Sequence, residues 1–177
     1  MTLLADNPSD TLRQGDVCTV DHFPQWDVEK SPSLTLPNGT VGIQLAAWSP
    51  VQSAPGGGHL VVVCSHDCDV ENPRSRTGIL LAPLVKVPAS HASPEYERIM
   101  GSGEVAGEEL AYINFFPLEL PVEEGDPSAV VADFSAIIAM GRPSSAIPKL
   151  VSTKLFEMDD FARSNFKTKL AAFVGRP

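Results

Sequence analysis

The chain has 177 residues, of which 43% are hydrophobic, so one domain with an ordinary core is expected over residues 1–177. Thirteen Lys and Arg against 22 Asp and Glu give a formal net charge of −9, which disfavours a nucleic-acid partner, although a local basic patch would still bind one. The chain carries neither an apolar run long enough to cross a membrane nor a signal-peptide pattern in its first ten residues, so a cytoplasmic protein without a membrane partner is expected.

The predicted secondary structure is mostly strand. A first strand is expected within Leu12 to Phe23, with Val17 and Thr19 on one face and Cys18 and Val20 on the other. Residues 24–40, with three prolines and an Asn-Gly turn signal, predict a long loop or short hairpin, and residues 49–58 a flexible connection. Further strands are predicted at residues 41–48, 59–65, 78–87, 111–120 and the first half of 129–140.

Two helices are predicted. Residues 94–100 begin with Pro94 and end before Gly101, which suits a short helix. Residues 159–174 predict an amphipathic helix packed on the sheet, because five apolar residues fall near one face at helical spacing. These five are Phe161, Phe166, Leu170, Phe173 and Val174. The expected fold is therefore mainly β with minor α.

Reactive side chains are concentrated in "HLVVVCSHDCDVEN", residues 59–72. In an extended strand Cys64, His66 and Cys68 would share one face at steps of about 6.5–7 Å, too far apart for one ion with bonds of about 2.0–2.3 Å. A shared site therefore requires the chain to turn at residues 65–67, and the Ser, His and Asp there favour leaving the strand.

With such a turn, a metal site is one hypothesis. Cys18, Cys64 and Cys68 with His66 would form a Cys₃His set, which suits zinc better than magnesium or calcium. His22 or His59 would be the alternative nitrogen ligand. Three cysteines spaced in this way are weaker evidence than two separated C-x-x-C pairs.

Two other interpretations of the cysteines are open. In the first, they are buried small hydrophobic residues, as free cysteines often are. In the second, Cys68 is a reactive thiol, with His66 as its base and Asp69 beside it as the third catalytic candidate. Carboxylates on both sides of Cys68 oppose thiolate formation, so this chemistry requires His66.

Three segments resemble a known family. "RQGDV" entering a first strand, "GHLVVVCSHDCD" and "GILLAPL" resemble the opening of the PemK/MazF-like toxin barrel. The chain is more similar to uncharacterised bacterial proteins with a Gly-Asp strand, a Ser-x-x-Cys-Asp strand end, here Ser65 to Asp69, and a C-terminal helix like "ARSNFKTKLAAFVGRP".

The resemblance implies an SH3-like small β-barrel with inserted loops, its core at about residues 12–120, in a bacterial toxin–antitoxin or phage-defence context. It does not carry over the toxin's RNA cleavage. Among the toxin's catalytic residues only Ser65 maps onto this chain, and "TVDHFPQWDVEK" after the first strand lacks the expected arginine.

Three functional hypotheses follow. The first is a metal- or partner-binding module built on the Cys/His/Asp cluster. The second is a hydrolase or nuclease that uses Cys68 and His66 or a bound metal. The third is an acidic protein-interaction module without chemistry, whose Pro-rich loop at residues 24–37 meets a basic partner protein. The sequence makes no prediction of the oligomeric state.

Overall fold

The computed structural model describes residues 4–5, 9–21, 49–50, 58–72, 74–75, 77–87, 94–101, 112–118 and 129–175. The predicted strand at residues 41–48, the loop at residues 24–40 and His22 lie outside these residues. The strands are β1 (Leu4–Ala5), β2 (Val17–Val20), β3 (Ser49–Pro50), β4 (His59–Val63), β5 (Ile79–Val87), β6 (Phe115–Leu118), β7 (Ala129–Asp133), β8 (Ile138–Met140) and β9 (Lys154–Met158). The helices are α1 (Asp67–Glu71), α2 (Pro94–Gly101), α3 (Ala146–Ser152) and α4 (Asp160–Val174), with a 3-10 turn at Phe134–Ala136.

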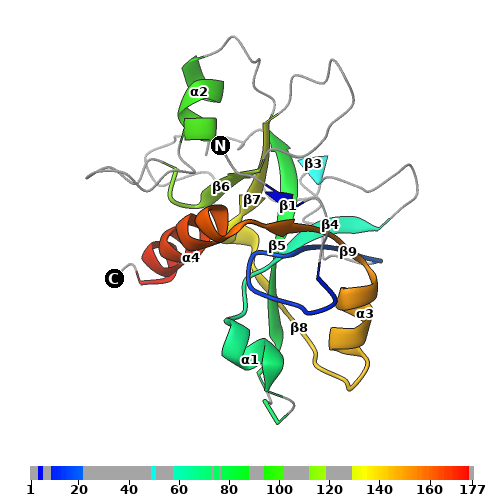
Figure 1. The fold of residues 1–177 in the computed structure, drawn as a ribbon. Coiled ribbons are helices and arrows are strands. Elements are labelled where there is room, and N and C mark those ends of the chain that lie inside the picture. The colour runs from blue at the N-terminus through cyan, green and yellow to red at the C-terminus, as the bar shows by residue number, and fades with distance from the viewer. Residues whose placement is uncertain are drawn as a thin grey trace, which may run out of the picture.

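The strands form one antiparallel sheet in the order β1-β9-β2-β4-β5-β7-β6, and β3 and β8 also pair with β5 (Figure 1). The predicted class, mainly β with minor α, is confirmed. The path is open: its end strands β1 and β6 pair only with β9 and β7 among the described residues. The described strands therefore form an open sheet and do not close into the small barrel that the resemblance implied.

Strand β5, with nine residues, is the longest described strand and pairs with neighbours on both of its edges. On one edge its first part pairs with β8 through Leu81, and its last part pairs with β7 from Leu84 onward. Ala82 and Pro83 fall in the gap between these two ladders, while Pro83 faces Val61 of β4 on the other edge. This interruption of the ladder suits Pro83, because proline has no N–H to donate.

Helices cover both faces of the sheet. One face packs against α4 through an apolar cluster that includes Val17, Val62 and Phe166. The other face packs against α1 and α3 through a second cluster that includes Cys18 and Leu150, and α2 covers a third, smaller cluster. The neighbours Val17 and Cys18 belong to opposite faces, as the predicted alternation requires.

Helix α4 begins where the sequence predicted. Asp159 is its N-cap and accepts a hydrogen bond from the Ala162 N–H at 2.7 Å. Phe166 is fully buried, with its ring edge-on to Phe116 at 5.2 Å and to Phe134 at 5.4 Å. None of the helices in the described part of the chain has the length and apolar character that a membrane crossing requires.

The predicted apolar face of α4 is only partly correct. Phe166 and Leu170 are buried, but Phe161 and Val174 are 62% and 69% exposed. A helix turns about 100° per residue, so Phe161 lies about 140° around the axis from Phe166 and cannot face the same sheet.

Candidate functional site

The reactive segment leaves the sheet as soon as β4 ends. The Cys64 N–H donates to the Leu80 carbonyl at 2.8 Å, and the Ser65 hydroxyl accepts from the Leu80 N–H, also at 2.8 Å. The chain then bends at Ser65, and His66 becomes the N-cap of α1. The predicted turn at residues 65–67 is therefore confirmed, and it takes the form of a short helix start.

The turn brings His66 and Cys68 together on the surface. The His66 Nδ1 atom lies 3.0 Å from the Cys68 Sγ atom and accepts the Cys68 backbone N–H at 3.3 Å. When the ring proton is on Nε2, Nδ1 is an acceptor and the Cys68 thiol is the donor in the 3.0 Å contact. Both side chains are exposed, so an accessible thiol has a base within hydrogen-bond reach.

Asp67, between these two residues, ties α1 to the rest of the molecule. Its carboxylate accepts hydrogen bonds from the Gln14 backbone N–H and from the Lys167 ammonium, each at 2.6 Å. Burial works to raise the pKa of Asp67, but the bonds from Lys167 and Gln14 outweigh it and lower the pKa. Asp67 therefore stays ionised and links the turn before β2 to helix α4.

Arg142 holds the other end of α1. Its guanidinium donates to the carbonyls of Asp69, Val70 at 2.8 Å and Asn72 at 2.9 Å. The last carbonyls of a helix have no partners within the helix, and a basic side chain is a common donor to them. Sequence reasoning missed Arg142, because about 70 residues separate it from α1 and no local pattern signals the contact.

A groove of about 750 Å³ opens beside this turn, between the start of β5 and helix α4. Its polar lining includes His66, Asp69 and Lys167, and its apolar lining includes Leu80 and Val174, which are 40% and 69% exposed. The remaining lining residues are Gln14, Cys64, Ser65, Thr77, Gly78, Leu170 and Ala171. The volume is in the range of small-molecule sites, which is about 300–1,000 Å³.

The predicted zinc ligands do not all meet. Cys18 lies in the apolar cluster under α1 and α3, and Cys64 lies in the cluster under α4, so the sheet separates them. Burial raises the pKa of each thiol to about 12, and the Asp16 charge adds to the effect at Cys18. Only His66 and Cys68 of the four lie together, and the described residues contain no group of three His, Cys, Asp or Glu side chains placed to hold a metal ion.

Asp69, the third catalytic candidate, lines the groove and is half-buried. Its backbone N–H donates to the His66 carbonyl at 2.9 Å. Within the described ranges no hydrogen bond joins the Asp69 carboxylate to the His66 ring, so the contact that the structure shows is a pair, His66 with Cys68.

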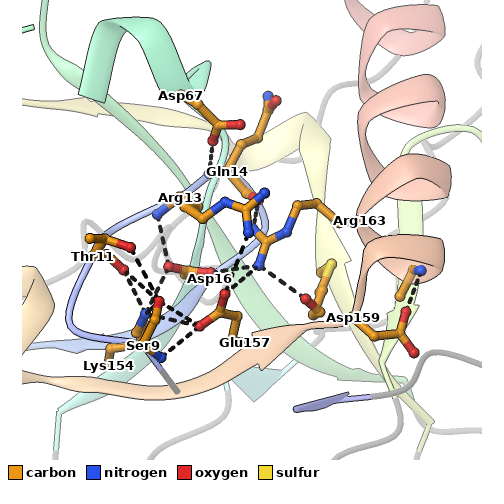
Figure 2. Close-up of polar contacts among 12 residues, drawn as sticks. Ser9, Thr11, Arg13, Gln14, Asp16, Asp67, Lys154, Glu157, Asp159 and Arg163 are labelled. Atoms are coloured by element: carbon orange, nitrogen blue, oxygen red, sulfur yellow. Dashed lines mark hydrogen bonds and ion pairs between the residues drawn. The ribbon is translucent and has the colours of Figure 1, made fainter. Parts of the chain in front are cut away.

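Next to the groove residue Gln14 lies a buried charge cluster, formed by Asp16, Lys154, Glu157 and Arg163 (Figure 2). Arg163 Nη2 lies 3.1 Å from Asp16 Oδ1 and 3.3 Å from Glu157 Oε1. Lys154 Nζ lies 3.3 Å from the other oxygen of each carboxylate. The two buried cations balance the two carboxylates, as buried charges need, and the partly exposed Arg13 guanidinium lies a further 3.7 Å from Glu157 Oε1.

The local environment shifts the pKa values of the two carboxylates of the charge cluster in opposite directions. Burial raises the pKa of Asp16 and outweighs the Arg13 backbone hydrogen bond and the nearby positive charges. Burial also works to raise the pKa of Glu157, but hydrogen bonds from the Ser9 N–H, the Ser9 hydroxyl and Lys154 lower it to about 2. The cluster touches the groove through Gln14, whose carbonyl accepts from Arg163 and whose amide donates to the Cys64 carbonyl at 2.7 Å.

Comparison with known proteins gives no match: no family model, no curated protein and no solved structure is significantly similar to this chain. The resemblance to PemK/MazF-like toxins therefore stays a prediction from sequence, and the functional argument depends on the geometry.

Proposed function

We propose that the chain is a thiol-dependent hydrolase, with Cys68 as nucleophile, His66 as its base and the adjoining groove as the substrate site. The observation that carries the proposal is the 3.0 Å contact between Cys68 Sγ and His66 Nδ1 on an accessible turn. His66, the base of the pair, and Asp69, the residue after Cys68, line the groove, whereas Cys68 itself is not among its lining residues. A substrate that extends from the groove past His66 would bring its reactive carbon to the Cys68 sulfur, which lies 3.0 Å from the His66 ring nitrogen.

The chemistry needs only water as a second reactant. The Cys68 sulfur attacks an acyl carbon as its proton passes to His66 Nδ1, and a carbon–sulfur bond forms. His66 returns that proton to the leaving group as the acyl bond breaks. A water molecule, deprotonated by His66, then attacks the thioester, which releases the acid and restores the thiol.

The test is the detection of an acyl-enzyme on Cys68. The purified protein is incubated with p-nitrophenyl acetate, p-nitrophenolate release is followed by absorbance, and the acyl adduct is located by peptide mass spectrometry. We expect adduct on Cys68 alone, none in Cys68→Ser, and release in His66→Ala slower by about 100-fold or more, the usual contribution of a general base. Equal rates in the wild type and both variants would refute the proposal.

A second candidate function is favoured by the exposed aliphatic side chains of the groove. Leu80 and Val174 are large apolar residues in contact with solvent, which is typical of a surface that binds an apolar group. In this interpretation the groove binds an apolar segment of a partner without chemistry. Leu80→Asp should then abolish binding, and Leu155→Asp is the matched control, because Leu155 is an equally exposed strand leucine outside the groove lining.

Zinc remains a separate proposal. His66 and Cys68 offer one nitrogen and one sulfur donor, whereas structural zinc sites use four ligands. Native mass spectrometry tests it directly: a mass increment of one zinc, lost on acidification and absent from Cys68→Ser, would support zinc binding at this pair.

A further inference from the structure

The reactive pair lies on a helix that cannot hold itself in place. Helix α1 has five residues, far fewer than the roughly 12–15 that an isolated helix needs in water. The contact between His66 and Cys68 exists only while the backbone between them keeps its helix-start conformation. Contacts from outside α1 must therefore maintain the geometry of the pair.

Those contacts come from both ends of the helix. At the start, the Asp67 carboxylate is held by Gln14 and Lys167, both at 2.6 Å. At the end, the Arg142 guanidinium donates to the carbonyls of Asp69, Val70 and Asn72. One of these acceptors, the Asp69 carbonyl, belongs to the residue next to Cys68 in the chain.

Arg142 lies in the connection directly after strand β8. It lies two residues after Met140, which pairs with Ile79 at the end of the β5–β8 ladder, and it precedes Pro143, whose ring fixes one backbone angle. A guanidinium offers five donors in one rigid plane, so a single side chain can serve three carbonyls. The sheet thus holds the end of α1 through one side chain.

We propose that Arg142 is the positioning residue of the Cys68–His66 pair. This inference rests on the proposed function, because it assigns Arg142 a role in the reactivity of that thiol. Arg142 contacts backbone atoms and no reacting atom. Without it, the carbonyls of Asp69 and Val70 lose this donor and Asn72 keeps only the Ser75 N–H, so the end of α1 frays and the sulfur moves away from the ring nitrogen.

The experiment measures how fast iodoacetamide alkylates Cys68 at pH 7, with peptide mass spectrometry to assign the site. Cys18 and Cys64 are buried and give no background in the folded protein. We expect Arg142→Met to slow alkylation by about 10-fold to 100-fold, because a displacement of about 1 Å at a reacting centre costs up to about 100-fold. Lys149→Met is the matched control: it removes an exposed cation from the neighbouring helix α3 and should leave the rate unchanged.

Two further measurements separate positioning from a general loss of stability. Arg142→Lys should recover part of the rate, and millimolar guanidinium should raise the rate of Arg142→Ala but not that of the wild type. In the His66→Ala background, Arg142→Met should have no additional effect, because the pair is already broken.

Each outcome has one consequence. If Arg142→Met reacts as fast as the wild type, or slows alkylation equally in the presence and absence of His66, the positioning role is refuted while the thiol hypothesis stands. If His66→Ala reacts as fast as the wild type, the proposed thiol chemistry itself fails. A variant that loses its circular dichroism spectrum is judged by Arg142→Lys and by guanidinium rescue, and failure of both also refutes the positioning role.

Discussion

Substitution of Arg163 by methionine tests whether the buried charge cluster stabilises the fold. Arg163 is 3% exposed and donates to Asp16, Glu157 and the carbonyls of Gln14 and Met158. Methionine fills similar space but has no donor. The substitution therefore leaves the buried Asp16 with Lys154 as its only cation among the described residues and two carbonyls without this partner, while the packing volume changes little.

The expected cost is large. Breaking a buried ion pair by removing one partner costs about 3–5 kcal/mol, against a total stability of about 5–15 kcal/mol for a typical domain. The second substitution Asp16→Asn should restore part of this loss, because it removes one of the two carboxylates that would otherwise share Lys154. By contrast, Lys149→Met breaks the exposed pair with Asp21 and should cost less than about 1 kcal/mol.

Urea unfolding followed by far-UV circular dichroism gives the free energy of unfolding of each variant. The measurements are made at low salt and at high salt. The loss in Arg163→Met should be nearly independent of salt, because a buried pair is screened little. A loss below about 1 kcal/mol, equal to that of Lys149→Met, would refute the view that this cluster stabilises the fold.

Four more variants test the fold and its pH dependence. Gly15→Ala should cost about 1–3 kcal/mol in urea unfolding, because Gly15 has φ +94° and a Cβ atom there would meet Met158 Sδ at 3.0 Å. Phe166→Ala should cost about 3–5 kcal/mol in the same assay, whereas Phe161→Ala, on the exposed side of α4, should cost almost nothing. The depressed pKa of Glu157 gives stability that is fully present above pH 4.5 and is lost as the pH falls toward 2. Across that range the free energy of unfolding of the wild type should fall by about 3 kcal/mol more than that of Glu157→Gln, because one pKa unit corresponds to about 1.4 kcal/mol. If the two proteins lose stability in parallel as the pH falls, Glu157 is not the group responsible.

The central strands were predictable because their apolar residues alternate between two covered faces. Strand β9 and helix α3 were missed for the opposite reason. The charged residues Lys154 and Glu157 in "KLFEM", residues 154–158, are typical of an exposed segment. In the structure, however, the Lys154 side chain is nearly buried and Glu157 is buried. The partners that make this burial tolerable, Asp16 above all, lie far away in the sequence, so no local pattern could have revealed the strand.

The candidate site was predictable in position but not in composition. Residues that favour leaving a strand predicted the turn and hence the approach of His66 to Cys68. The zinc set required the strand register as well. Cys18 pairs with Val61 of β4, so it shares a face with Val61 and Val63, while period two turns Cys64 to the opposite face. Because register depends on pairing between distant segments, the sequence alone could not show this separation.

Helix α4 connects the charge cluster to the candidate site through two side chains on one face. Arg163 and Lys167 are four residues apart, so they lie one above the other; Arg163 donates to the Gln14 carbonyl and Lys167 to the Asp67 carboxylate. The Gln14 N–H donates to Asp67 and closes the loop of contacts.

Lys167→Met should therefore change the reactivity of the candidate site while leaving the stability of the fold nearly unchanged. It removes a half-exposed pair, so its cost in urea unfolding should be far smaller than that of Arg163→Met. It also releases the start of α1 from α4, so the alkylation rate of Cys68 should fall although the fold is intact. A Lys167→Met variant with unchanged Cys68 reactivity would show that Gln14 and Arg142 suffice to hold the turn, and that α4 shapes only the groove.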